Sequence, residues 1–214
     1  MTLIEMLVVV GIIGVMTSMV VPAFNSIGRT ASLNSTGNQI ADLMSMARQN
    51  SVSKNGMTAL ILVTDTTSGQ QALTVMQLLP LENDQALTSG NWTQITGWSR
   101  ITGGVFADVN PNDSSTCTTF QTAVNGAAQT SGPPLPVVTF GNRQPGTYKY
   151  VLFNSSGALF SGSNAMLFLA NGILPTGSTS GAFNPPIASG SSLPSRYYKL
   201  TAVAATGQVK VDLP

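Results

Sequence analysis

The chain of 214 residues contains no histidine, and this absence limits the chemistry that its side chains can perform. Without histidine, a hydrolase would need a serine activated by a lysine, or a pair of carboxylates. Beyond the apolar N-terminus the lysines are Lys54, Lys149, Lys199 and Lys210, and the carboxylates are scattered. None of these residues lies in a recognisable nucleophile motif, so we do not expect an enzyme.

One short motif is typical of a metal-binding loop. Asp108, Asn110 and Asn112 form an Asp-x-Asn-x-Asn run, and oxygen ligands at alternate positions begin calcium loops. The glycine expected next is replaced by Asp113, and no glutamate closes the loop. Asx turns explain the same residues. These three residues are therefore a weak candidate for a metal site, because turn formation also explains their presence. We expect no cofactor.

The single cysteine, Cys117, excludes an intramolecular disulfide and any two-cysteine metal or redox motif. We expect a buried, small apolar side chain there, and an intermolecular bridge is the alternative.

Charged residues make up only 8% of the chain, and the net charge is +1. Such a surface attracts polyanions weakly, so nucleic acid is not expected as a partner.

The carboxylate of Glu5 lies where a charge is costly. It is the only charged residue in the apolar run of residues 1–24, MTLIEMLVVVGIIGVMTSMVVPAF. As a helix, residues 6–24 would span about 28 Å, close to the thickness of a bilayer core, so the run is typical of a membrane helix. A charge in such a segment costs roughly 3 kcal/mol and should have a partner. The next basic side chain is Arg29, so the α-amino group of Met1, from this or a neighbouring copy, is the expected partner.

These residues carry a resemblance to a known family. The sequence Thr-Leu-Ile-Glu at residues 2–5, followed by an apolar helix with Gly11, Gly14 and Pro22, resembles the mature N-terminus of type IV pilins and of the related pseudopilins of type II secretion. A signal peptide should instead have a basic region before its core and a cleavage site after it, and neither is present. An ordinary signal anchor is the remaining alternative.

The resemblance implies how the N-terminus is made and used. In this family a leader peptidase cuts after a glycine and methylates the new first residue, so we expect Met1 to be that processed and N-methylated residue. Glu5 would pair with the N-terminal amine of a neighbouring subunit. The implied partners are the leader peptidase and methylase, the inner membrane before assembly, and identical or related pilin subunits, with a homopolymer expected.

A second helical segment continues the first. Ile40, Leu43, Met44 and Ala47 recur at i, i+3, i+4 and i+7 and form one apolar stripe. The pattern ends between Asn50 and Gly56, where Ser-Lys-Asn-Gly is a stop signal. We therefore divide the chain into an apolar transmembrane and polymerisation helix (1–24), its amphipathic continuation (25–54) and a globular head (55–214).

The helix is weakest between Gly14 and Pro22. Glycine and proline both disfavour helix interiors, and Thr17, Ser18 and the β-branched valines weaken the same turns. The pilin resemblance implies that this segment, marked by Gly14 and Pro22, loses helical hydrogen bonds when the subunit enters a filament. A tolerated kink, as membrane helices often have, is the alternative.

The remainder of the chain is typical of an antiparallel sheet wrapped on the helix. A hairpin is predicted from residues 58–64 and 72–79. The other predicted strands are 92–101, 137–140, 147–153, 158–161, 165–170, 197–204 and 208–213. Long polar loops are predicted at 110–119, 125–136 and 174–194. The fold class is thus α+β, and the order of motifs in the head resembles H-type minor pseudopilins and related minor pilins.

The sequence indicates a structural subunit of an extracellular type IV pilus or pilus-like filament that polymerises through its N-terminal helix. It would lie in the inner membrane before assembly and outside the cell, or in a periplasmic pseudopilus, afterwards. The alternatives are a minor pseudopilin of a type II secretion system and a DNA-binding minor pilin. The cations that could bind DNA if they shared a face are Arg143, Lys149, Arg196, Lys199 and Lys210.

Overall fold

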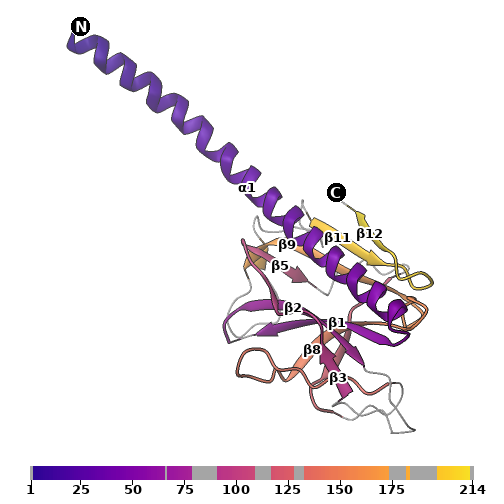
Figure 1. Cartoon of the computed structure of the whole chain (residues 1–214). Coiled ribbons are helices and arrows are strands. Elements are labelled where there is room, and N and C mark those ends of the chain that lie inside the picture. The colour runs from indigo at the N-terminus through magenta and orange to yellow at the C-terminus, as the bar shows by residue number, and fades with distance from the viewer. Residues whose placement is uncertain are drawn as a thin grey trace.

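The computed structural model describes residues 2–65, 67–78, 91–108, 117–127, 133–173, 182–183 and 197–212. Within these ranges, the description of side chains leaves out residues 19–27, 108, 117–119 and 182–183. One long helix, α1, projects from a head made of two β-sheets and their connections (Figure 1).

Helix α1 (Leu3–Ser53) begins and ends at residues suited to those positions. Its N-cap is Thr2, and at its other end Asn55 has a left-handed φ of 48°. Asparagine tolerates this conformation better than most residues. The Gly56 amide then donates to the Ser51 carbonyl at 3.0 Å. The stop predicted between residues 50 and 56 is confirmed.

Only the second half of α1 packs on the head. Its inward side chains repeat every three or four residues and are all buried: Leu33, Thr36, Ile40, Met44, Ala47 and Ser51. This spacing places them on one face of a helix. The predicted apolar stripe is confirmed for Ile40, Met44 and Ala47, while Leu43 lies half-buried at its margin.

The described strands are mostly short. They are β1 (Met57–Asp65), β2 (Gln70–Leu78), β3 (Trp92–Gln94), β4 (Ser99–Ile101), β5 (Val105–Asp108), β6 (Cys117–Thr119), β7 (Gln121–Val124), β8 (Thr147–Phe153), β9 (Asn164–Ile173), β10 (Ala182–Phe183), β11 (Tyr197–Ala202) and β12 (Val209–Asp212).

These strands form two sheets where the sequence predicted one. The first sheet has the order β3-β2-β1-β8-β7, with β4 also paired to β2. The second sheet has the order β10-β9-β11-β12, with β5 and β6 also paired to β9. All described pairs are antiparallel except β6 with β9. The antiparallel β-rich head is therefore confirmed, and its division into two sheets corrects the prediction.

The strands predicted at 147–153, 165–170, 197–204 and 208–213 are confirmed as β8, β9, β11 and β12. They include β8, which pairs with the distant strand β1. The β1–β2 hairpin is confirmed, with a register from Met57–Leu78 to Asp65–Gln70. The strand predicted at 92–101 is wrong as one unit, because a bend around Gly97 divides it into β3 and β4. Residues 137–140 and 158–161 are not strands either. Each segment forms only an isolated bridge, Phe140 with Arg143 and Leu159 with Phe153.

The core has two parts, one on each face of the first sheet. The larger part lies between α1 and the two sheets and includes Ile40, Leu62 and Leu167. The smaller part lies on the opposite face and includes Ile61 and Tyr148.

Residues 133–140 cover this smaller part without forming a strand, because side chains bind their backbone groups. The Asn125 amide bonds both the N–H and the C=O of Val138, at 2.8 and 2.7 Å. The Tyr148 hydroxyl donates to the Pro136 carbonyl at 2.7 Å.

Candidate functional site

The first turn of α1 is closed by a reciprocal capping box. The Thr2 amide donates to the Glu5 carboxylate at 2.6 Å, and the Glu5 amide donates to the Thr2 hydroxyl at 3.4 Å. The Thr-x-x-Glu spacing before an apolar run is the sequence signature of this motif. The sequence prediction for Glu5 was a pairing with the Met1 amine of the same or a neighbouring copy, and it did not include this capping role. Met1 lies outside the described residues, so its methylation and its pairing with Glu5 remain predictions.

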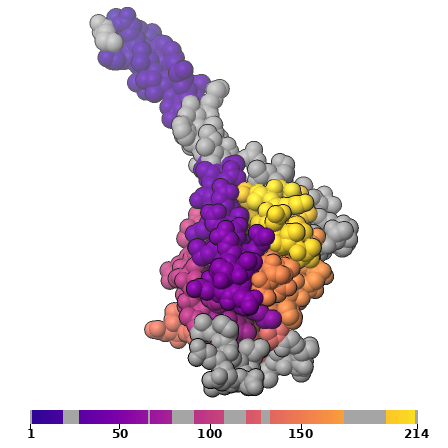
Figure 2. Space-filling view, turned by 45° about the vertical axis from the view of Figure 1, so that its right-hand side comes forward, coloured from indigo at the N-terminus to yellow at the C-terminus, as the bar shows by residue number. Residues whose placement is uncertain are grey.

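Beyond this cap, α1 presents apolar side chains to its surroundings on every side. Eleven large apolar side chains are between 46% and 84% exposed: Leu3, Ile4, Met6, Leu7, Val8, Val9, Val10, Ile12, Ile13, Val15 and Met16. The space-filling view shows this part of the helix standing clear of the head (Figure 2). Among the described residues, no helix is both long enough and apolar enough to cross a membrane.

The segment predicted to unwind is helical in the single chain. Gly14 and Pro22 both lie within α1. The Thr17 and Ser18 hydroxyls donate to carbonyls of the preceding turn, those of Ile13 and Val15, at 2.7 Å each. Such bonds compete with the backbone ladder and often accompany bending. Unwinding concerns the assembled state, so it remains a prediction.

Contacts between the second half of α1 and the head fix the direction in which the helix projects, and the closest of them is at Gly37. A Cβ atom added at Gly37 would overlap the ring of Tyr198 from β11. The Tyr198 hydroxyl also donates to Asn38 Oδ1 at 2.9 Å. Further along α1, Arg48 Nε donates to the Thr206 carbonyl at 2.6 Å. These contacts hold the second half of α1 on the second sheet, so the first half projects in a defined direction.

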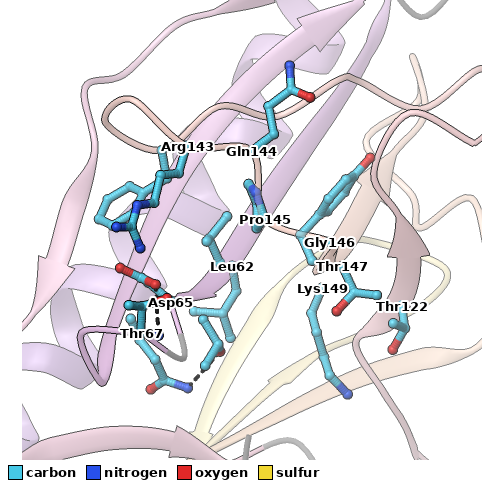
Figure 3. Close-up of a pocket in the computed structure, with 15 residues that line it drawn as sticks. Leu62, Asp65, Thr67, Thr122, Arg143, Gln144, Pro145, Gly146, Thr147 and Lys149 are labelled. Atoms are coloured by element: carbon cyan, nitrogen blue, oxygen red, sulfur yellow. Dashed lines mark hydrogen bonds between the residues drawn. The ribbon is translucent and has the colours of Figure 1, made fainter. Parts of the chain in front are cut away.

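The head contains a cavity of about 400 Å³ at one end of the first sheet. It opens where β1 and β8 separate. Their register runs from Thr58–Phe153 to Leu62–Lys149 and stops there, although β1 continues to Asp65 and β8 begins at Thr147. Phe140 and residues 143–146 form another wall. Figure 3 shows Arg143 above the Asp65 carboxylate on one side of the cavity and Thr147 and Lys149 on the other.

The pKa values of two side chains that line this cavity, Asp65 and Tyr148, are shifted. The Asp65 carboxylate accepts hydrogen bonds from the Ser68 hydroxyl at 2.6 Å and the Thr67 amide at 3.0 Å. The bond from Ser68 contributes most to holding the pKa of Asp65 below its usual value. Tyr148 is buried, and burial raises the pKa of its hydroxyl well above the usual range, with Tyr150 adding to the shift.

The structure separates the four described cations among the five considered for DNA binding. Arg143 and Lys149 line the cavity in the first sheet. Lys199 and Lys210 lie on the adjacent strands β11 and β12 of the second sheet. Arg196 lies outside the described residues. The four described cations are thus divided between two sites.

The candidate metal loop is not open to a structural test. Asp108 ends β5, its side chain is not described, and Asn110 and Asn112 lie outside the described residues. Within the part of the chain that the structure describes, no three His, Cys, Asp or Glu residues lie where they could hold a metal ion together. Cys117 begins β6, and its side chain is likewise not described.

No protein-family model and no curated protein sequence matches the chain. Two solved structures of the minor pseudopilin EpsH from the type 2 secretion system of Vibrio cholerae are similar to it, with 14% identity each and TM-scores of 0.41 and 0.37. They match over 86% of this chain and 98% and 96% of theirs. The type IV minor pilin FimU of Pseudomonas aeruginosa is similar with 12% identity and a TM-score of 0.38, over 86% and 94% of the two chains. These proteins are of the kind that the N-terminal residues resemble.

Proposed function

We propose that this chain is a structural subunit of an extracellular type IV pilus or pilus-like filament and polymerises through the first half of α1. The observation that carries the proposal is the exposure of eleven large apolar side chains on residues 3–16. A surface of this size and character marks an interaction site. Identical helices packed side by side would cover it.

The role proposed for Glu5 follows from its position in this surface. In the single chain its carboxylate accepts from the Thr2 amide at 2.6 Å, which leaves further acceptor capacity on the same group. The N-terminal amine of a neighbouring subunit would supply the missing positive charge. The proposal extends to an earlier stage, in which the apolar residues 1–24 hold the subunit in the inner membrane, and that stage is supported by the sequence alone.

The test distinguishes the role of Glu5 in the capping box from its role in pairing with the N-terminal amine of a neighbouring subunit. Glu5→Ala removes both the capping box and the carboxylate, whereas Thr2→Ala breaks the box and keeps the carboxylate. We expect filament yield to fall strongly for Glu5→Ala and for Glu5→Gln, and to stay near normal for Thr2→Ala. Quantitative mass spectrometry of sheared surface filaments and of the membrane fraction measures assembly and insertion in one sample. Normal filament yield from Glu5→Ala would remove the basis for pairing.

A second pair of variants tests the apolar surface itself. Ile12→Lys places a charge among the exposed apolar side chains, and Gln49→Lys places the same charge on an exposed position of α1 beside the head. Only Ile12→Lys should prevent assembly. The abundance of the wild-type chain in sheared filaments also separates the bulk subunit proposed here from a minor pseudopilin, which would be scarce there.

A further inference from the structure

The segment of residues 133–140, here called the strap, is held on the first sheet in the way that a peptide ligand is held. It covers the smaller part of the core and belongs to no strand. Side-chain donors of the first sheet bind three alternate carbonyls of the strap: Trp92 Nε1 binds Pro134 at 2.8 Å, the Tyr148 hydroxyl binds Pro136 at 2.7 Å, and Asn125 Nδ2 binds Val138 at 2.7 Å. The donors come from β3, from β8 and from the turn after β7, so the strap crosses the sheet from one edge strand to the other.

The strap is attached to the sheet through side chains alone. Among the described residues, its backbone forms no ladder with any strand, and the Val138 N–H donates to Asn125 Oδ1 at 2.8 Å. Its buried anchors are the side chains of Leu135 and Val138. A segment with so few backbone hydrogen bonds and buried side chains opens at a lower free energy than a strand inside a sheet.

The prolines of the strap keep it extended even when it is free. Proline fixes its own φ near −65° and disfavours a helical conformation in the residue before it, and the strap has prolines at 133, 134 and 136. Proline also lacks an N–H, so the strap offers mainly carbonyls, which are the groups that the three donors bind. Grooves with aromatic walls recognise proline-rich segments because such segments lose little conformational freedom on binding. The groove under the strap has two buried aromatic donors, Trp92 and Tyr148.

From these contacts we propose that the strap is an internal ligand, and that the groove it closes binds an extended, proline-rich segment of another protein when the strap opens. The partner segment presents free carbonyls at alternate residues and apolar side chains in the places of Leu135 and Val138. The groove lies on the face of the first sheet opposite α1. It is therefore separate from the proposed polymerisation through α1.

Calorimetric titration of the full chain in mild detergent micelles tests recognition by the groove. The probe is the acetylated and amidated peptide Pro-Pro-Leu-Pro-Val-Val-Thr-Phe, which has the sequence of residues 133–140. One control peptide has serine in place of leucine and so lacks an apolar anchor. Another has alanine in place of the second and third prolines, which keeps the carbonyls and removes the extended bias.

Two pairs of variants compare an open groove with a closed one. Leu135→Ser removes the buried anchor of the strap and leaves all three donors in place, whereas Val137→Ser changes a strap side chain that is 39% exposed. On the Leu135→Ser background, Tyr148→Phe removes one donor. Tyr150→Phe is the matched change on the same strand, at a hydroxyl that makes no hydrogen bond among the described residues.

The peptide should bind the Leu135→Ser chain saturably. It should bind the wild-type and Val137→Ser chains at least about tenfold more weakly, because their own strap occupies the groove and the apparent affinity falls with the open fraction. The serine peptide should not bind, and the alanine peptide should bind roughly four- to thirtyfold more weakly. Tyr148→Phe should weaken binding by about fivefold, and Tyr150→Phe should leave it unchanged.

Hydrogen exchange of the wild-type chain tests the opening of the strap without any substitution. The Val138 amide should exchange about a hundredfold or more faster than the amide of Ile61, which lies in β1 between β2 and β8.

Four results would overturn the proposal. They are equal exchange rates of the two amides, equal affinity of the wild-type and Leu135→Ser chains for the peptide, equal binding of the serine peptide, and a wild-type dimer that Leu135→Ser converts to a monomer in analytical ultracentrifugation. The last result would assign the groove to a second copy of the chain. If Leu135→Ser fails to fold, the exchange rates of the wild-type chain still decide.

Discussion

Replacing Gly37 with alanine should destabilise the head, although alanine is the better helix former. In the structure a Cβ at this position would overlap the Tyr198 ring, whose side chain is 4% exposed and is enclosed by the larger core. Either the ring or the helix must therefore move. Movement of the ring also lengthens the 2.9 Å bond from its hydroxyl to Asn38.

The magnitude follows from three opposing contributions. Overpacking a filled core costs typically 1–3 kcal/mol. Loss of the hydrogen bond between Tyr198 and Asn38 adds about 1 kcal/mol. The higher helix propensity of alanine returns about 1 kcal/mol. The free energy of unfolding should therefore fall by roughly 1–3 kcal/mol.

Urea unfolding followed by tryptophan fluorescence measures this change, since Trp92 and Trp98 both belong to the head. The matched control is Gly28→Ala, because Gly28 lies in the same helix and a Cβ there meets no atom within 4 Å. This control should leave stability unchanged or raise it. Tyr198→Ala provides the background for a double-mutant cycle, in which Gly37→Ala should cost much less once the ring is gone.

A Gly37→Ala variant as stable as Gly28→Ala would refute the close contact. A cost that stays the same in the Tyr198→Ala background would refute the assignment of that cost to the ring.

Three other outcomes are expected. Burial raises the pKa of the Tyr148 hydroxyl, so above about pH 10 the folded state keeps this proton while the unfolded state loses it, and stability should fall as the pH rises. Tyr148→Phe should lower stability by about 1 kcal/mol at neutral pH, because the hydrogen bond to the Pro136 carbonyl is lost. The same variant should show a smaller loss of stability at alkaline pH, measured by urea unfolding. Gln71→Leu should cost about 2–4 kcal/mol in thermal unfolding, because the buried amide bonds both the N–H and the C=O of Ala107, at 2.7 and 2.9 Å, and both groups would lose their partners. A fragment starting at Asn25 should be a soluble, folded monomer, and an unfolded circular dichroism spectrum would show that the head needs a neighbouring chain.

Local patterns in the sequence determined several elements, including the strand β8, whose partner β1 is distant in the chain. The spacing of Ile40, Met44 and Ala47 indicated the packed face of the helix, and Ser-Lys-Asn-Gly indicated its end. Two β-prone runs separated by a Ser-Gly turn predicted the β1–β2 hairpin. The capping signal from Thr2 to Glu5 was also present in the sequence, although we assigned Glu5 another role. Each of these features depends on side chains no further apart in the chain than Met57 and Leu78, the outermost pair of the hairpin.

Only the tertiary structure decided the features that depend on distant registers. The two short strands β5 and β6 exist because they pair with β9, more than 40 residues further along the chain. The cavity exists because β1 and β8 stop pairing at Leu62 and Lys149, and no local pattern marks that point. The contact of Gly37 with Tyr198 joins residues 161 positions apart. Such contacts depend on how the helix and the two sheets pack against one another, so they cannot be predicted from the spacing of residue types along the chain.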